Sequence, residues 1–467
     1  MPIDLSLDPT EVSLLNDLYE FTVAAAFFER GMNDTASFEV TVRRFPPSRG
    51  YMIAAGLERV LELLEDFHFD AAAISYLESL QIFKPEFLAH LSQMRFTGSI
   101  RAIADGSVFF AGEPVLEVRG PLIEAQMLEP LILNQLGFAS LAATKAARCF
   151  SVAAGRRLVE FGLRRAQGAD AALIAARSSY LAGFNGTSNL LAGKRYGLPV
   201  FGTMSHSFIM AHDSERRAFE DFARTFPKLN TMLVDTYDTI RGVENVLELA
   251  VRLAKDDIKI QAIRLDSGNL EQLSRESRRI LDRHGLTDIA IFGSGNLDEY
   301  KIAELIKASA PIDAFGVGTS LTVSDDAPSA DYTYKLCEYR GRPRLKTSSG
   351  KVTVPGRKQV FRAIDNSGHF SSDRIGLLDE GSASAAREFK PAASKLIPML
   401  ETVLENGKRT AVRPTLTQSR EHFIAQLAML GERQRALSNP TQYPVRLTAA
   451  LNAMTISEKL RAEVLQD

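Results

Sequence analysis

The chain has 467 residues, of which 45% are hydrophobic and 24% charged, and its formal net charge at pH 7 is −2. This length exceeds what one hydrophobic core usually supports, so we expect two or three modules. The near-neutral charge gives no basic field for nucleic acid or anionic lipid, and two cysteines are too few for a disulfide framework or a thiolate metal cage. Neither a signal peptide nor a run of about 18 apolar residues is found, which predicts a cytoplasmic protein without a membrane span.

Residues 1–124 predict an α+β module. The segment 9–30 opens with an N-cap, a first-turn proline and a capping carboxylate, and Gly31 follows it, so we expect one helix there. Apolar residues alternate with polar ones over 38–42, which predicts a half-buried strand. Short apolar runs separated by turns over 98–121 predict a small antiparallel sheet.

Residues 125–330 alternate short apolar runs with helical stretches. The six runs end at Gly162, Thr203, Asp235, Asp266, Ser294 and Thr319. Successive ends lie between 25 and 41 residues apart, which is the repeat of strand–helix units with parallel strands. Such units form an open doubly wound sheet or a closed barrel. We favour a barrel, because reactive residues follow all six strands, whereas an open sheet concentrates its site at one switch point.

Strand-like runs return after residue 330. We expect 331–392 to complete the first module, which is then split around the barrel. Residues 393–467 have amphipathic helical patterns and predict a C-terminal helical extension. The expected fold class is therefore α/β: a parallel β/α barrel, a split α+β N-terminal module and a helical C-terminal extension.

Two late strand ends carry glycines that suit an anion. The runs FGSGN (292–296) and FGVGTS (315–320) place backbone amides where they can bind phosphate without a lysine. Glycines at such turns are also routine for steric reasons, so each loop alone is ambiguous. Two in succession at the end of a barrel-like repeat favour a phosphate site. The chain has no GxxxxGK followed by Ser or Thr, which excludes a P-loop nucleotide enzyme.

Charged residues also follow two of the strands. Arg264 and Asp266 share one side of a strand because side chains alternate, so one interpretation is that they pair with each other. The other has Arg264 binding a carboxylate or phosphate while Asp266 meets ribose hydroxyls or a magnesium ion. Arg164 and Arg165 follow the first barrel strand. Adjacent surface arginines are most often solvated, but at the mouth of a barrel they are expected to meet anions.

His206 lies just past the second strand end, beside hydroxyl groups and a glycine. A lone histidine is more often structural than catalytic, but this position is on the face where such folds do chemistry. His212 would face elsewhere on the helix, and neither HExxH nor GxSxG occurs, which argues against a metal site and a serine hydrolase. Two roles are left for His206: general base, or nucleophile toward a phosphoryl group.

Six runs in order resemble the nicotinate phosphoribosyltransferase family: LLNDLYEFTVAAAFF, EFGLRRAQG, FGTMSHSFI, DTYD, RLDSGNL and FGVGTSL. The resemblance covers about residues 10 to 365, and the C-terminal part carries no matching motif. It implies the irregular α/β barrel of the type II phosphoribosyltransferases, usually in a homodimer with sites near the subunit interface. It also implies that nicotinate and phosphoribosyl pyrophosphate give nicotinate mononucleotide and pyrophosphate. The resemblance further implies that the reaction is coupled to ATP hydrolysis, requires Mg2+ and begins NAD salvage from nicotinate.

The resemblance also implies roles for single residues. His206 matches the histidine that ATP transiently phosphorylates, and Tyr19 matches the aromatic residue that contacts the nicotinate ring. Thr203 and Arg264 match the other nicotinate contacts, and Thr319 matches a phosphoribosyl pyrophosphate contact. The remaining site residues match motif segments only, and their substrate contacts are our expectation: Arg164, Asp235, Asp266, Ser294 and Gly295. The metal ligands are unknown, with Asp266 the candidate for reaching magnesium-bound phosphates.

Four other functions stay open at this point. A nicotinamide phosphoribosyltransferase has a similar barrel and histidine, and would turn over the amide in place of the acid. A quinolinate phosphoribosyltransferase shares the chemistry without ATP. A degenerate scaffold would sense nucleotides without turnover, although every polar strand end is intact. A phosphate-binding barrel isomerase or aldolase would need a Schiff-base lysine or a glutamate base at a strand end, and we find neither there.

Overall fold

The chain divides into two compact units. The computed structural model describes residues 9–348, 353–389 and 393–464. Unit 1 comprises Met1–Leu141 and Ser329–Asp467, and unit 2 comprises Ala142–Pro328. Unit 1 is therefore built from both ends of the chain, with unit 2 inserted between them. The first boundary between the units lies later in the chain than the expected one at residue 125. It falls inside the continuous helix α6 (Glu129–Val152).

Unit 2 contains a six-stranded sheet in which all strand pairings are parallel. In spatial order its strands are β7 (Gly186–Thr187), β6 (Arg157–Glu160), β11 (Ala314–Val317), β10 (Ala290–Gly293), β9 (Ala262–Leu265) and β8 (Thr231–Leu233). Their apolar side chains, such as those of Ile263, Ile291 and Phe315, are fully buried. This is typical of a parallel sheet whose strands are covered on both faces. The predicted parallel strand–helix repeat is confirmed.

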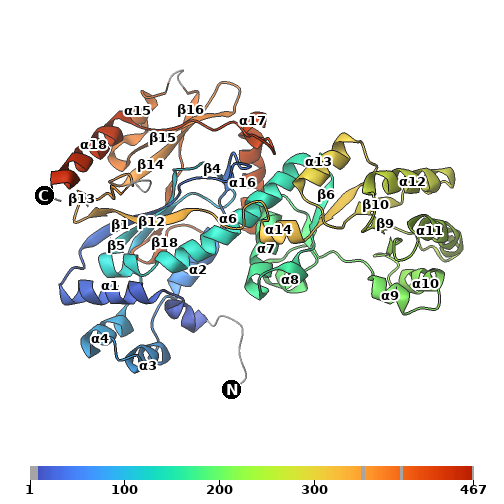
Figure 1. Cartoon of the computed structure of the whole chain (residues 1–467), viewed down its shortest axis with the longest axis horizontal. Helices are drawn as coiled ribbons and strands as arrows, with labels where there is room; N and C mark the ends of the chain where they lie inside the picture. Colours follow the sequence, from blue (N-terminus) through green and yellow to red (C-terminus); the bar gives the residue numbers. More distant parts are fainter. Residues whose placement is uncertain (1–8, 349–352, 390–392, 465–467) are drawn as a thin grey trace. The chain divides into compact units, whose positions relative to one another are not determined.

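Helices connect these strands along the chain (Figure 1). They are α7 (Ala169–Leu181), α8 (Leu190–Tyr196), α9 (His206–Met210), α10 (Glu215–Thr225), α11 (Thr239–Leu253), α12 (Leu270–Arg283), α13 (Glu299–Lys307), α14 (Thr319–Val323), and the 3-10 turns η2 (Leu163–Arg165) and η3 (Ala254–Asp256). Among the described strands, pairing runs from β7 to β8 without joining these two, so closure into a barrel is not confirmed.

One strand of unit 2 differs from the sequence-based prediction. The run PVFGT was expected to be the second strand, but only Val200 bridges in parallel to Thr187. Pro199 lacks the N–H that a ladder needs, which limits pairing at this point. The second strand is instead the two-residue β7, which pairs with β6. The segment that follows Val200 therefore reaches His206 as an irregular loop.

Unit 1 contains two larger sheets and a two-stranded ribbon. The seven-stranded sheet has the order β13 (Arg342–Pro343), β12 (Tyr332–Tyr339), β1 (Thr35–Val42), β5 (Pro114–Pro121), β3 (Ser99–Ala102), β17 (Glu401–Glu405) and β18 (Lys408–Arg409). The four-stranded sheet has the order β16 (Lys395–Pro398), β14 (Lys358–Ile364), β15 (Phe370–Leu377) and β19 (Val445–Leu447), and the ribbon pairs β2 (Met52–Ile53) with β4 (Val108–Phe109). The predicted strand at 38–42 is confirmed, but it is not half-buried. Glu39 is buried there, and its carboxylate lies 2.9 Å from Lys358 Nζ.

The helices of unit 1 differ from the predictions in two places. They are α1 (Leu18–Glu29), α2 (Leu57–Glu65), α3 (Ala71–Ser79), α4 (Pro85–Gln93), α5 (Leu122–Gln126), α15 (Gly381–Ala386), α16 (Leu416–Met429), α17 (Glu432–Arg435) and α18 (Ala449–Val464), with the 3-10 turns η1 (Pro9–Leu14) and η4 (Leu378–Glu380). The helix predicted over 9–30 is divided into η1 and α1. Asn16 makes the break, because its Nδ2 donates to Met127 O at 2.7 Å and its Oδ1 accepts from Asp17 N.

The predicted C-terminal helical extension is not confirmed in that form. Alongside α16 and α18, the segment from residue 393 contributes β16 and β19 to the four-stranded sheet and β17 to the seven-stranded sheet. Figure 1 shows these helices in red beside the orange strands of the same unit. The C-terminal segment is therefore part of the core of unit 1.

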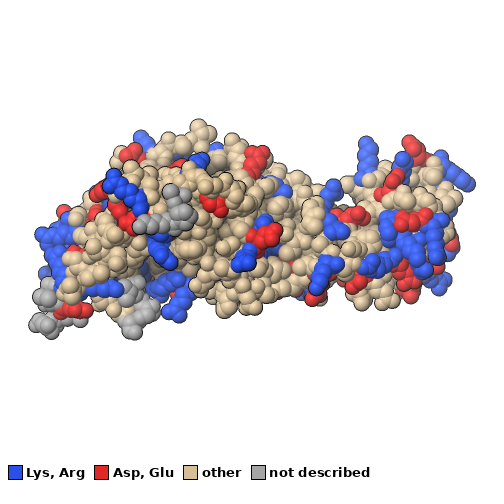
Figure 2. All heavy atoms as spheres, turned by 90° about the horizontal axis from the view of Figure 1, so that it is seen from above, with Lys and Arg blue, Asp and Glu red and all other residues tan. Residues whose placement is uncertain are grey.

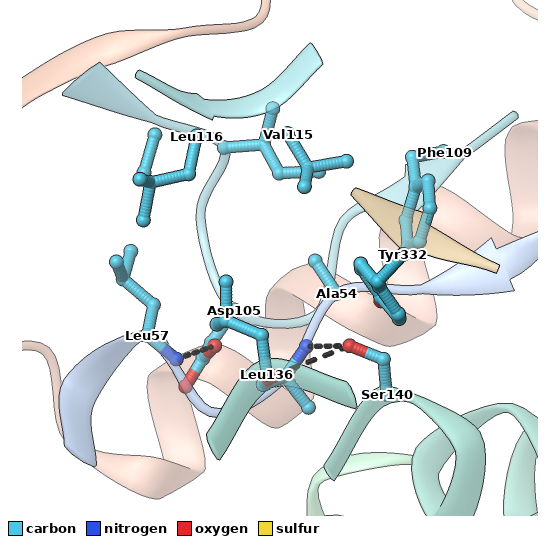
Figure 3. Close-up of a pocket in the computed structure, with 12 residues that line it drawn as sticks. Ala54, Leu57, Asp105, Phe109, Val115, Leu116, Leu136, Ser140 and Tyr332 are labelled. Atoms are coloured by element: carbon cyan, nitrogen blue, oxygen red, sulfur yellow. Dashed lines mark hydrogen bonds between the residues drawn. The ribbon is translucent and has the colours of Figure 1, made fainter. Parts of the chain in front are cut away.

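A small cavity inside unit 1 is lined mainly by apolar side chains (Figure 3). Two of its polar residues form hydrogen bonds with backbone N–H groups at the start of α2 and just before it. Asp105 Oδ1 accepts from Leu57 N at 3.0 Å, and Ser140 Oγ lies 3.2 Å from Ala55 N. The cavity has a volume of about 20 Å³, which is room for about one water molecule. It is therefore too small to bind a nucleotide.

The protein surface mixes charges of both signs. Figure 2 shows Lys and Arg interspersed with Asp and Glu over the face that it draws. The chain also forms ion pairs near its surface, such as Arg224 with Asp256 at 2.8 Å and with Glu220 at 3.1 Å. Such pairs add little stability. No helix in the described part of the chain has the length and apolar character needed to cross a bilayer.

Candidate active site

His206 is the first residue of α9, at the end of the loop that follows Val200. Ser205 caps this helix, because its Oγ accepts from Phe208 N at 3.3 Å. The imidazole Nδ1 lies 3.1 Å from Thr236 Oγ1, and Nε2 lies 3.7 Å from Asp266 Oδ2. The second distance is too long for a hydrogen bond. The ring is therefore held by Thr236, and 42% of the side chain is exposed.

Arg264, on β9, lies at the centre of a polar cluster in unit 2. Its guanidinium donates from Nε to Ser294 Oγ at 2.8 Å, from Nη1 to Thr203 Oγ1 at 3.0 Å and from Nη2 to Asp266 Oδ1 at 2.7 Å. Its carbon Cζ also lies 5.5 Å from the ring centre of Phe161. The structure therefore brings Thr203, Ser294 and Asp266 together around one arginine. The interpretation that Arg264 and Asp266 pair is confirmed, and the guanidinium retains further N–H groups for a ligand.

Asp235 and Asp266 follow the neighbouring strands β8 and β9. Asp235 Oδ2 accepts from Asp266 N at 3.0 Å and from Ser267 Oγ at 2.5 Å, so these strand ends are tied together. Burial raises the pKa of Asp266, but Arg264, Ser294 and His206 outweigh burial and hold that pKa below its usual value. Asp266 is therefore ionised near neutral pH.

Gly295 follows β10 and closes the cluster from another side. Its φ of +92° is one that residues with a side chain rarely adopt. A Cβ atom at this position would lie 1.9 Å from the carbonyl oxygen of Asp266. The turn after β10 therefore packs directly against the backbone that carries Asp266, and only glycine fits there.

Arg164 and Thr319 lie after the neighbouring strands β6 and β11 but outside the Arg264 cluster. Arg164 is in η2 and Thr319 is the first residue of α14, and both are exposed. The structure thus places them at the same end of the sheet as His206, without a direct bond to the cluster among the residues described. Their contacts with phosphate stay predictions.

Tyr19 belongs to unit 1, whereas the other predicted site residues belong to unit 2. It lies near the start of α1 and is 49% exposed. Partial burial and the neighbouring carboxylates of Glu20 and Glu129 raise the pKa of its hydroxyl well above the usual value. Tyr19 is therefore a neutral, accessible phenol. Its contact with nicotinate stays a prediction.

Three residues of this region were missed in the sequence. Thr236 orients His206, and Phe161 lies beside Arg264 with its ring stacked on Phe292 at a centroid distance of 5.6 Å. Glu160 is buried at the end of β6. All three lie in runs that the sequence analysis singled out, since Thr236 belongs to DTYD and the other two open EFGLRRAQG, but their contacts are not visible in the sequence.

The residues of the site fit a magnesium ion that is held together with a substrate. Within the described ranges, no group of three or more His, Cys, Asp and Glu is placed to share a metal ion. Asp235 Oδ1, however, is buried without a hydrogen-bond partner among those residues, and Asp266 is ionised. Magnesium usually binds through one or two carboxylates plus substrate phosphates. Asp235 and Asp266 therefore match such a shared site and not a site formed by protein alone.

We predict that Gly295→Ala destabilises the protein far more than Gly285→Ala. Both glycines have positive φ, but a Cβ at Gly285, just after α12, meets no atom within 4 Å. Gly285→Ala should therefore lower the free energy of unfolding by roughly 1–2 kcal/mol, which is the cost of a left-handed backbone in a residue with a side chain. Gly295→Ala should lower the free energy of unfolding by about 1–3 kcal/mol more, because the new Cβ atom collides with Asp266. Urea unfolding of both variants measures the difference, and equal losses would contradict the close packing at Gly295.

Comparison with known proteins matches this chain to one family along most of its length. Three sequence models match: the nicotinate phosphoribosyltransferase N-terminal domain at residues 14–136, the nicotinate phosphoribosyltransferase family at 156–340 and the corresponding C-terminal domain at 357–455. The last match corrects the expectation that the resemblance ends near residue 365.

Individual relatives match over nearly their whole lengths. Nicotinate phosphoribosyltransferase pncB2 of Mycobacterium tuberculosis is 47% identical over 438 residues, or 93% of this chain and 91% of the relative. The human nicotinate phosphoribosyltransferase is 32% identical over 516 residues, which cover 95% of this chain and 96% of the human one. The crystal structure of human nicotinic acid phosphoribosyltransferase aligns with a TM-score of 0.85 at 30% identity, covering 94% of this chain and 99% of that one. A nicotinate-nucleotide pyrophosphorylase structure from Pyrococcus furiosus aligns with a TM-score of 0.74 at 25% identity, covering 92% of this chain and 99% of that one.

Proposed function

Because this chain belongs to the nicotinate phosphoribosyltransferase family, we propose that it converts nicotinate and phosphoribosyl pyrophosphate to nicotinate mononucleotide and pyrophosphate. We propose further that ATP hydrolysis drives this transfer through a phosphohistidine at His206, as the first step of NAD salvage from nicotinate. The relatives' names support the transfer. The observation that carries the coupling is the position of His206, a partly exposed residue whose Nε2 lies 3.7 Å from Asp266 Oδ2 in the Arg264 cluster.

Nicotinate binding is assigned to Arg264 and its neighbours. The guanidinium is held in place by Ser294, Thr203 and Asp266, so its remaining N–H groups are already oriented when a carboxylate arrives. Thr203 offers a hydroxyl beside them, and the Phe161 ring supplies an apolar surface for a flat ligand. Tyr19 is expected to contact the ring of the substrate as well.

The transfer breaks the bond between ribose C1′ and the pyrophosphate oxygen, while the pyridine nitrogen lone pair forms the new bond to C1′. Positive charge develops on the ribose and negative charge on the leaving group. We assign the stabilisation of the ribose to the carboxylate of Asp266, which is ionised in the folded protein. Arg164 and Thr319 would bind the phosphates. A magnesium ion held by Asp235, Asp266 and the phosphates would neutralise part of the phosphate charge.

His206 is the residue that we propose to react with ATP. We assign the proton of the neutral imidazole to Nδ1, which donates to Thr236 Oγ1 and leaves the Nε2 lone pair free. Nε2 attacks the γ-phosphorus of ATP, a P–N bond forms, and the bond to the β–γ bridging oxygen breaks to release ADP. Water later cleaves the P–N bond and releases phosphate. If the phosphorylated enzyme favours the state that binds substrates better, hydrolysis draws the transfer toward product.

Other properties stay proposals of the same kind. A homodimer with sites near the subunit interface and a cytoplasmic location follow from the resemblance and the composition. Among the alternatives, a nicotinamide enzyme would turn over the amide in preference to the acid, and a quinolinate enzyme would show no ATP hydrolysis. Assays of acid and amide turnover with and without ATP therefore separate these functions.

We predict that His206→Asn abolishes both the phosphoenzyme and ATP hydrolysis but leaves slow, ATP-independent transfer. Asparagine keeps a polar side chain but lacks the nucleophilic ring nitrogen. The measurement is label from γ-labelled ATP that stays on denatured protein and is released by acid. His212→Asn is the matched control, because His212 is bonded to Phe208 O within the same stretch and should leave labelling intact. Full ATP stimulation in His206→Asn would refute the role.

We predict that Arg264→Ala raises the KM for nicotinate far more than the KM for ATP. A hydrogen bond to a charged partner contributes about 1.5–3 kcal/mol, so the nicotinate KM should rise roughly 10- to 100-fold. Turnover of nicotinamide, which has no carboxylate, serves as the control and should change much less. A nicotinate dependence that stays as in the wild type would count against Arg264 as the carboxylate contact.

A further inference from the structure

Glu160 is a buried carboxylate at the site end of unit 2 to which the proposed reaction gives no task. It is the last residue of β6 and is 1% exposed. Burial raises its pKa, while hydrogen bonds from Thr187, Gly162 and Thr322 act in the opposite direction. Burying a carboxylate costs free energy, and a fold keeps it only with fixed partners. The question is what these partners hold in place.

The carboxylate of Glu160 joins three segments of unit 2. Its Oε2 accepts from Thr187 Oγ1, on β7, at 2.5 Å. Its Oε1 accepts from Gly162 N, in the turn after β6, and from Thr322 Oγ1, on α14, at 3.5 Å. All three partners are donors, which suits an ionised carboxylate. Because these groups surround both oxygens, Glu160 does not present a catalytic base to a ligand.

Gly162 shows how closely the turn after β6 and α14 pack together. A Cβ atom at Gly162 would lie 1.5 Å from Thr322 Oγ1 and 2.8 Å from Glu160 Oε1. The turn continues directly into η2, which carries Arg164, and α14 begins at Thr319. Arg164 and Thr319, the two predicted phosphate contacts, therefore lie on two of the three segments that Glu160 connects.

We propose that Glu160 is a positioning residue for phosphoribosyl pyrophosphate. Its carboxylate holds the turn after β6 and the start of α14 in register, so that Arg164 and Thr319 reach the phosphates of one substrate together. It acts through these two residues and not on the reacting atoms. This inference rests on the proposed function of the same site.

The test compares Glu160→Ala and Glu160→Gln in the full-length protein. Glu160→Ala leaves Gly162 N without its acceptor, so the KM for phosphoribosyl pyrophosphate should rise about tenfold or more, while the KM for nicotinate should change less than about twofold. Glu160→Gln should restore most of the loss. Its amide oxygen still accepts from Gly162 N, and its NH2 group can donate to Thr187 Oγ1, whose hydroxyl can turn.

Glu215→Ala and Glu215→Gln are the matched controls. Glu215 is a buried glutamate of α10 that accepts from Asn245 Nδ2 at 2.7 Å, and burial raises its pKa as well. Both pairs of variants should lower the melting temperature. Only the Glu160 pair should change the KM for phosphoribosyl pyrophosphate selectively. An unchanged KM in Glu160→Ala, or an equal rise for every substrate, would overturn the inference.

Two outcomes need separate treatment. If Glu160→Ala does not fold, Thr322→Val removes the hydroxyl on the α14 side at nearly constant volume. A rise confined to the KM for phosphoribosyl pyrophosphate supports the inference, and no rise overturns it. If the wild-type protein shows no transfer at all, the proposed function has failed. Calorimetric binding of phosphoribosyl pyrophosphate to the wild type and the Glu160 variants then decides the inference by itself.

Discussion

The ion pair between Arg264 and Asp266 is the constraint on which the rest of the site depends. Each partner is bound elsewhere as well: Arg264 to Thr203 and Ser294, and Asp266 through its backbone to Asp235. The pair therefore ties the ends of three neighbouring strands to the loop that leads to His206. Because both side chains of the pair are held by several defined partners, little side-chain freedom is left to lose when a ligand binds.

Local anion contacts matter in a protein with almost no net charge. At −2 overall, and with mixed charges on the face shown in Figure 2, long-range attraction of a polyanionic substrate is weak. Recognition must then come from a few arginines and hydroxyls placed at short range, where desolvation strengthens each contact. Most of these residues directly follow strands of the parallel sheet, so the sheet fixes their positions.

The strand ends could be predicted from sequence because their spacing and polar residues are local signals. Five of the six expected strands exist, and Asp235, Asp266 and Ser294 follow theirs as anticipated. The lateral order of strands is not a local signal, and it places β6 next to β11 although more than 150 residues separate them in the chain. The environment of Glu160 depends on this order, so its role could not be inferred from its motif. The break at Asn16 likewise depends on Met127.

The insertion of unit 2 has a consequence for biosynthesis. In the seven-stranded sheet of unit 1, β1 lies between β5 and β12, and the ribosome makes β12 only after the whole of unit 2. The nascent chain thus completes unit 2 while one edge of β1 still lacks its neighbour. An unpaired strand edge of this kind is a template for association with other chains. A fragment that ends after unit 2 but before β12 should therefore contain a folded insert and an aggregation-prone host.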